Sequence, residues 1–135
     1  MTQIDTQALR LAMQRTLPRK LSDYVIDNLL ADRLLDRCDL FRHEPTSILN
    51  IGSRHGYVTQ SLMNRYPTAT VQSVEMFSAW EALFKKRLMD QNVSWVSSYD
   101  DLSADAHTYD FIFSSLALSV TSHWLDYFQA WQRVL

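Results

Sequence analysis

Two glycines place the strongest constraint on the fold of this chain. Gly52 and Gly56 are the only glycines in 135 residues, where average usage of roughly 7% would give about nine. Both fall between an apolar segment at residues 47–51, which is expected to be a strand, and a helical pattern at residues 57–66. Glycine adopts left-handed backbone conformations that other residues avoid. We therefore expect residues 52–56 to form a tight turn between a strand and a helix.

The hydrophobic pattern along the rest of the chain predicts alternating helices and strands. That alternation is typical of an α/β fold with a parallel, doubly wound sheet. The length favours one globular unit, with N-terminal helices at residues 1–44 and an α/β domain at residues 45–135. The expected strands are residues 47–51, 70–76, 92–96 and 109–114. The expected helices are residues 5–17, 21–41 and 57–66, one that opens at Ser78, and one from residue 122 to 135.

Several local patterns are more specific. Ser78 followed by Glu81 is a capping-box signature for a helix N-terminus. The apolar run from Phe111 to Phe113 predicts a strand that is buried on both faces. The helix at residues 21–41 has near-helical spacing at Val25, Leu29, Leu30, Leu34 and Phe41. The last helix has the clearest helical spacing, at Trp124, Tyr127, Phe128, Trp131, Val134 and Leu135.

Composition and charge exclude several classes of function. The net charge of −2 gives no basic patch for nucleic acid. No apolar run is long enough to span a bilayer, and residues 1–5 lack the features of a secretory signal. Cys38 is the only cysteine, which excludes an internal disulfide and a multi-cysteine metal site, so no metal is expected. These features favour a protein of the reducing cytoplasm that binds neither nucleic acid nor membrane.

The segment from Leu49 to Tyr57, with sequence LNIGSRHGY, resembles the cofactor-binding signature of class I S-adenosylmethionine (SAM) methyltransferases. A dinucleotide-binding fold would need its third glycine at Tyr57, so the spacing favours SAM over a nicotinamide cofactor. Glu75 ends the second expected strand, where a carboxylate can accept hydrogen bonds from ribose hydroxyls. The resemblance implies a Rossmann-like sheet with strand order 3-2-1-4. It also implies a set of cofactor-binding residues: Asn50, Gly52, Ser53, Gly56, Glu75, Met76 and Ser98.

Two further segments narrow the resemblance. ADRLLDR at residues 31–37 and YDFIFSSLAL at residues 109–118 are similar to the malonyl-carrier-protein O-methyltransferases of the biotin pathway. The related complex I assembly methyltransferases share these features. The similarity runs from about residue 22 to Leu135 and corresponds to the N-terminal half of the family. The family continues with three more strands, so the fourth strand here is expected to be an exposed apolar edge.

Departures from the family pattern lead to two hypotheses for function. Asn50 replaces an acidic residue, Ser98 replaces an aspartate that contacts adenine, and Arg54 replaces the middle glycine, where its side chain would compete with SAM. One hypothesis is a SAM-dependent methyltransferase with weakened or lost SAM binding. The other is a non-catalytic interaction module that binds a second copy or another protein through the exposed fourth strand and the C-terminal helix, where Trp124, Trp131 and Leu135 are expected to be half covered.

A third hypothesis, another nucleotide-binding module, rests on Glu75 alone. His55 and His123 are the histidines that could act as bases, but the sequence gives neither an identifiable carboxylate partner. No residue can therefore be assigned as catalytic from the sequence.

Overall fold

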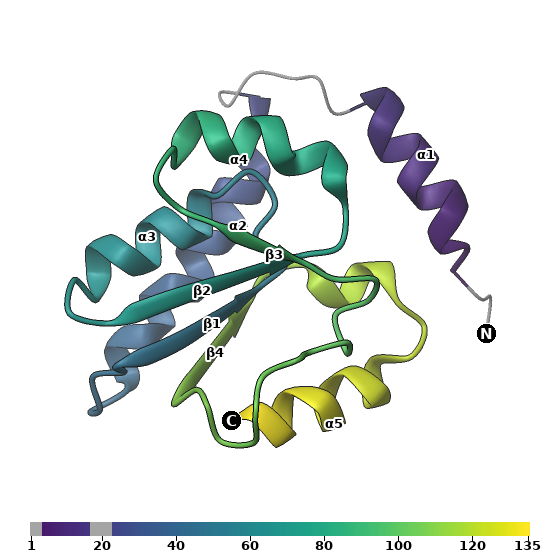
Figure 1. Ribbon diagram of the computed structural model, residues 1–135. Helices are drawn as coiled ribbons and strands as arrows, with labels where there is room; N and C mark the ends of the chain where they lie inside the picture. Colours follow the sequence, from purple (N-terminus) through teal and green to yellow (C-terminus); the bar gives the residue numbers. More distant parts are fainter. Residues whose placement is uncertain (1–3, 17–22) are drawn as a thin grey trace.

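The structure is a computed structural model that describes residues 4–16 and 23–135. These residues form a parallel sheet that is flanked by helices on both faces (Figure 1). Its strands are β1 (Ser47–Ile51), β2 (Thr70–Glu75), β3 (Val93–Trp95) and β4 (Phe111–Ser114). Its α-helices are α1 (Thr6–Thr16), α2 (Val25–Leu35), α3 (Tyr57–Arg65), α4 (Glu81–Arg87) and α5 (Trp124–Val134).

The strand order is β3-β2-β1-β4, and every pair of neighbours is parallel. In the central strand, Ile48 is paired with Val71 of β2 on one side and with Phe111 of β4 on the other. The chain therefore proceeds outward from β1 in one direction and then crosses back to place β4 on the opposite side. This arrangement confirms the predicted Rossmann-like α/β fold and its order 3-2-1-4.

Alternating side chains of β1 build a hydrophobic core on each face of the sheet. Ile48 is fully buried and belongs to a cluster with Leu35 of α2 and Leu62 of α3. Leu49 points to the other face, where the cluster includes Val134 of α5. Figure 1 shows α2 and α3 on one side of the strands and α5 on the other. Burial on both faces fits the apolar residues Ile48, Leu49 and Ile51 of β1, while the buried polar residue Asn50 interrupts the run.

The helix expected at residues 21–41 is shorter, and its apolar pattern faces the solvent. It starts at Val25, ends at Leu35, and continues as a 3₁₀ turn at Asp36–Leu40; residues 17, 21 and 22 lie outside the described residues. The apolar residues on which the prediction was based, Val25, Leu29, Leu30, Leu34 and Phe41, are all exposed. The buried residues are instead Ala31, Leu35 and Cys38. These three side chains belong to the core cluster that includes Leu62 of α3.

The capping box expected at Ser78 does not form. Residues Ser78–Trp80 make a 3₁₀ turn without a side-chain cap, and α4 begins only at Glu81. The Glu81 carboxylate pairs with Lys85 one turn later, with an Oε1–Nζ distance of 2.7 Å. The Glu81 side chain thus forms a surface ion pair along α4 and makes no cap hydrogen bond to the Ser78 backbone.

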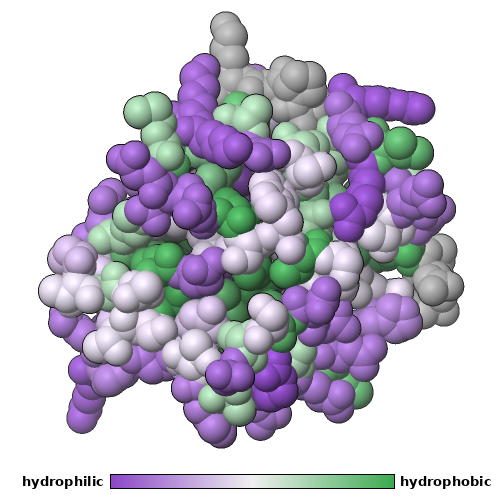
Figure 2. Space-filling view, in the orientation of Figure 1, coloured by the Kyte–Doolittle hydropathy of each residue, from purple (hydrophilic) through white to green (hydrophobic). Residues whose placement is uncertain are grey.

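Strand β4 is not buried on both faces as its apolar run predicted. Only Phe113 is fully buried, because within the described residues β4 has a neighbour on one side, β1. Next to it, α5 buries Tyr127, Trp131 and Val134. The prediction that Trp131 is half covered is wrong, since its exposed fraction is 7%, but Trp124 and Leu135 are about half exposed as expected. Figure 2 shows apolar side chains reaching the surface in small groups between polar ones.

Helix α1 packs at the carboxyl ends of β2 and β3. Arg10 of this helix donates hydrogen bonds to the carbonyl oxygens of Met76, at 2.5 Å, and Ser97, at 3.1 Å. The guanidinium also lies over the ring of Phe77, 5.3 Å from its centroid. One arginine thus joins α1 to the two segments that follow β2 and β3.

Candidate functional site

The turn after β1 has the backbone conformation that the two glycines predicted. The φ angles are +78° at Gly52 and +86° at Gly56, both in the left-handed region. Side-chain space is also restricted, because a Cβ atom at Gly56 would lie 3.0 Å from Cδ2 of Phe84 in α4. The turn is held to the sheet by the Gly52 N–H, which donates to the carbonyl of Val74 at 3.0 Å. The backbone geometry therefore favours glycine at both positions, and the packing of Phe84 adds a second reason at Gly56.

Glu75 lies beside this turn, fully buried at the carboxyl end of β2. Its Oε2 atom accepts a hydrogen bond from the Arg54 N–H at 2.7 Å. Its Oε1 atom accepts hydrogen bonds from the backbone N–H groups of Met76, at 3.0 Å, and Phe77, at 3.1 Å. Burial raises the pKa of Glu75, and its hydrogen bonds oppose that rise. The carboxyl group thus connects the glycine turn to the segment after β2.

A fourth donor to Glu75 comes from Tyr99, a residue that sequence reasoning missed. The Tyr99 hydroxyl donates to Oε1 of Glu75 at 2.6 Å, and the Tyr99 side chain is almost completely buried. Burial and the adjacent Glu75 carboxyl raise the pKa of the Tyr99 phenol. The available signal was its position directly after Ser98, because the segment after β3 was expected to face the cofactor.

Arg54 occupies the middle of the glycine turn with φ +51°, a conformation that costs energy for a residue with a Cβ atom. Its guanidinium stacks over Trp80 at 4.8 Å from the ring centroid and pairs with Asp27 of α2 at 3.2 Å. Arg54 also lines the small space between Gly52 and Tyr99. This placement is consistent with the expected competition between Arg54 and a ligand at the turn.

Two other residues of the expected cofactor set lie at the same place. Ser53 is buried, and its N–H donates to the carbonyl of Val74 at 3.1 Å. Its Oγ atom has no hydrogen-bond partner within the described part of the chain. Met76 follows Glu75 and uses its N–H on that carboxyl group and its carbonyl on Arg10. The structure thus groups Gly52, Ser53, Gly56, Glu75 and Met76 around the turn and the end of β2.

Asn50 and Ser98 have different surroundings. Asn50 is fully buried on the α3 side of the sheet, where its Nδ2 atom donates to Thr59 Oγ1 at 2.9 Å. Thr59 in turn is 2.8 Å from the hydroxyl of Ser73 in β2. The Ser98 hydroxyl donates to Tyr127 of α5 at 3.2 Å. The structure therefore does not bring either side chain to the Glu75 carboxyl.

Little room remains between these groups. The space bordered by Gly52, Arg54, Trp80 and Tyr99 has a volume of about 40 Å³. A single water molecule accounts for about 30 Å³ in the liquid, whereas small-molecule pockets typically measure roughly 300–1,000 Å³. In this conformation the site has space for a water molecule but not for a nucleoside.

His55 lies behind the turn in an aromatic cluster. Its ring stacks on Tyr24 at 4.7 Å and lies 5.7 Å from the ring of Trp80. Its Nε2 atom is 2.8 Å from the Asn28 side-chain oxygen, an arrangement that fits a neutral ring with the proton on Nε2. Burial lowers the pKa of His55 to about 4, helped by the positive charges of Arg87 and Arg54. His55 packs the turn and is not placed as a base.

The pKa of His55 predicts a pH dependence of stability. The unfolded chain takes up a proton near pH 6.5 and the folded chain only near pH 4, so the free energy of unfolding falls as the pH drops through this window. The full difference corresponds to about 3 kcal/mol. We expect His55→Gln to lose much less stability than the unsubstituted protein between pH 6.5 and 4, measured by urea denaturation.

The control is His123→Gln, which changes an exposed histidine at the start of α5. It should keep the full pH dependence. The raised pKa of Glu75 acts in the opposite direction, but it is common to all three proteins, so the comparison isolates His55. Identical slopes for His55→Gln and the unsubstituted protein would contradict the assignment.

Two features are absent from the part of the chain that the structure describes, a metal-binding cluster and a helix that could span a membrane. No group of three or more His, Cys, Asp or Glu side chains is arranged to hold a metal ion there. No helix among the same residues has the length and apolar character required to cross a bilayer.

A family described as a methyltransferase domain matches the sequence over residues 49–135, from the central strand to the last residue. The chain belongs to this methyltransferase family. The matched segment includes the glycine turn, Glu75, and the expected but diverged position Ser98. The identification agrees with the topology, because it covers all four strands apart from the first two residues of β1.

Curated relatives of this methyltransferase-domain chain act on a carrier protein, according to their names. A malonyl-[acyl-carrier protein] O-methyltransferase from Coxiella burnetii is 30% identical over 133 residues, covering 98% of this chain and 45% of the relative. The corresponding enzyme of Halorhodospira halophila is 29% identical over 122 residues, covering 85% of this chain and 40% of the relative. The chain therefore spans less than half the length of these relatives.

Solved structures show the same fold. A SAM-dependent methyltransferase from Leishmania major superposes with a TM-score of 0.72 at 18% identity, over 96% of this chain and 56% of that protein. The family match supports SAM as a possible cofactor. The residues at the turn do not fit SAM in this conformation. The Tyr99 hydroxyl is hydrogen-bonded to the Glu75 carboxyl group, and the space between Gly52 and Tyr99 is about 40 Å³.

Proposed function

We propose that this methyltransferase-like domain has lost the SAM affinity of a working methyltransferase and acts as a non-catalytic interaction module. The observation that carries the proposal is the Glu75 carboxyl group, which accepts four hydrogen bonds from its own chain. A ribose would have to displace the phenol of Tyr99 to use that group. The side chain of Arg54 at the turn supports the same conclusion, since the family pattern has a glycine there.

The alternative is a SAM-dependent methyltransferase that transfers a methyl group to a carboxylate, as the names of the relatives suggest for those proteins. Its support is the family match and the identity to these enzymes. A carboxylate acceptor is ionised at neutral pH and needs no general base. This alternative requires a rearrangement that moves Tyr99 and Arg54 away from the turn before any cofactor binds.

Isothermal titration of the 135-residue chain with SAM and with its demethylated product separates the two functions. We expect no binding heat up to millimolar ligand, while an active methyltransferase measured under the same conditions gives the positive control. Micromolar binding of either ligand would contradict the loss of affinity and favour the alternative.

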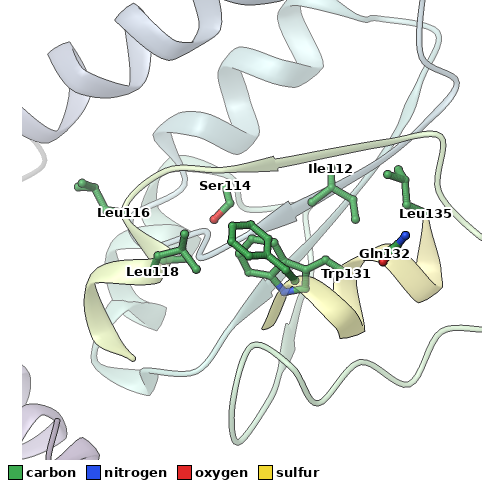
Figure 3. A pocket seen from close by; sticks show the side chains of 9 residues that line it. Ile112, Ser114, Leu116, Leu118, Trp131, Gln132 and Leu135 are labelled. Carbon is green, nitrogen blue, oxygen red and sulfur yellow. The ribbon is translucent and has the colours of Figure 1, made fainter. Parts of the chain in front are cut away.

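The interaction surface that we propose consists of the free edge of β4 and the exposed side of α5. Between them lies an apolar groove of about 460 Å³, lined by residues that include Ile112, Leu118, Trp131 and Leu135 (Figure 3). An open strand edge offers unpaired backbone groups for pairing with another chain. A second copy is the proposed occupant, because two identical edges can pair across a two-fold axis.

Sedimentation at increasing concentration tests this surface. We expect the weight-average mass to rise from monomer toward dimer, and Ile112→Lys, at the groove, to remain monomeric. The matched control is Met89→Lys, which changes an exposed apolar residue outside the groove and should associate as the unsubstituted chain does. A monomer at all concentrations would contradict self-association and direct the search to another protein partner.

A further inference from the structure

Tyr99 fills the space between the glycine turn and the end of β2. It follows β3, and the residue is 2% exposed. A Cβ atom placed on Gly52 would lie 3.6 Å from the Tyr99 hydroxyl oxygen and 3.7 Å from its Cζ atom. The phenol therefore lies directly against the side of Gly52 that has no side chain, while its hydroxyl hydrogen-bonds to Glu75.

This position is where a parallel sheet of this topology presents a ligand site. The chain runs from β1 to β2 and β3 on one side and then crosses to β4 on the other, so the switch point lies beside β1. Ligands of open α/β sheets bind outside the carboxyl ends of the strands at such a point. Glu75, at the end of the neighbouring strand, offers a carboxyl group that suits the hydroxyls of a ribose.

Two residues of α5 fix the position of Tyr99. The indole N–H of Trp131 donates to the backbone carbonyl of Tyr99 at 2.8 Å, and both groups are buried. The ring of Tyr127 contacts Tyr99 edge-on, with 6.0 Å between centroids. Helix α5 thus contacts the backbone carbonyl and the ring of Tyr99, and the Tyr99 hydroxyl is bound to Glu75.

We propose that Tyr99 is an internal occupant of a nucleoside site, with its hydroxyl bound to Glu75 in the place of a ribose hydroxyl. The ligand class is a nucleoside with free 2′ and 3′ hydroxyls. This inference rests on the proposed function, because it explains why the chain would have lost SAM binding. Shortening the Tyr99 side chain removes the ring from the turn and leaves Oε1 of Glu75 free to accept hydrogen bonds from such a ligand.

Adenosine is the probe, and 2′,3′-dideoxyadenosine, which lacks both hydroxyls, is the matched control ligand. We expect Tyr99→Ala to bind adenosine at least tenfold more tightly than the unsubstituted chain does, and at least tenfold more tightly than it binds the dideoxy form. Tyr99→Val, which keeps more buried apolar surface, should show the same preference. Titration calorimetry gives the affinities, and circular dichroism confirms the fold of each variant.

Two further variants separate the role of the ring from other effects. Tyr99→Phe keeps the ring and removes the hydroxyl, so it should bind no more adenosine than the unsubstituted chain. Tyr109→Val shortens a tyrosine elsewhere in the same core and should also leave adenosine binding unchanged. Binding by Tyr99→Phe equal to that by Tyr99→Ala would overturn the proposal.

The remaining outcomes are also decisive. Folded Tyr99→Ala and Tyr99→Val proteins that bind no adenosine, or bind both nucleosides equally, overturn the inference while the loss of SAM affinity still stands. Unfolding of both variants assigns Tyr99 to the core and overturns it too. Micromolar SAM binding by the unsubstituted chain instead contradicts the proposed function, so failure of the two claims gives different results.

Discussion

Replacing Trp131 by alanine should lower the free energy of unfolding by about 3–5 kcal/mol. Trp131 is 7% exposed and packs against Tyr127, with 5.9 Å between ring centroids. Its indole N–H also donates to the carbonyl of Tyr99, so the substitution leaves a buried acceptor unpaired in addition to the cavity. Urea denaturation followed by circular dichroism should show a lower midpoint with an unchanged slope.

The matched control is Trp124→Ala in the same helix. Trp124 is 51% exposed, and its ring contacts only Phe128 in a T-shaped arrangement among the aromatic pairs of the described residues. We expect its loss to cost no more than about 1 kcal/mol. Equal decreases in the free energy of unfolding for the two variants would show that the burial of Trp131 does not determine its contribution to stability.

The second large effect is expected from Glu75→Ala, which should lower the free energy of unfolding by at least about 3 kcal/mol. The substitution leaves the N–H groups of Arg54, Met76 and Phe77 without their acceptor, and each buried unpaired donor costs roughly 1–3 kcal/mol. Glu75→Gln keeps one acceptor oxygen and should lose less. Urea denaturation at neutral pH compares the three proteins.

Glu81→Ala is the control for removing a carboxylate. Glu81 pairs with Lys85 on the exposed surface of α4, and pairs of this kind contribute only about 0.3–0.5 kcal/mol. A loss of similar size for Glu75→Ala would mean that the buried carboxyl group contributes little to the fold. It would also weaken the argument that the chain itself uses the lone pairs of Glu75.

The sequence predicted the parts of the fold in which one local rule is sufficient. Gly52 and Gly56 are required by a turn with positive φ, and that requirement is visible in a chain with no other glycine. The strand order was obtained differently, from the family resemblance, because hydrophobic periodicity does not specify which strands are neighbours. The structure confirms both.

The two wrong predictions about helices, the buried face of α2 and the capping box at Ser78, have a common physical cause. At α2, the apolar spacing identified a face with Leu29 and Leu30, but the face that packs in the core carries Ala31 and Leu35. At Ser78, a local capping signal was overridden by the packing of Trp80, which is 1% exposed. Tertiary contacts between distant segments determined the result in both cases, and a single sequence does not encode them in its periodicity.

The sequence also predicted only part of the candidate site. Glu75 was located from its distance along the chain to the glycine turn, and the structure places it beside that turn. The role of Tyr99 depends on a side-chain contact between the segment after β3 and the end of β2. Asn50, assigned to the cofactor because of its motif position, is hydrogen-bonded to Thr59 on the α3 side of the sheet.

The central position of β1 has a consequence for the order in which the molecule folds. Ile48 finds its partner in β2 at Val71, but its other partner, Phe111 in β4, is synthesised much later. Pairing of such distant segments closes a long loop before its contacts are gained, which slows folding. During translation, the β1–β2 unit would therefore emerge from the ribosome before β4, with one apolar edge of β1 still unpaired. In this interval a chaperone that binds exposed apolar segments would have its largest effect.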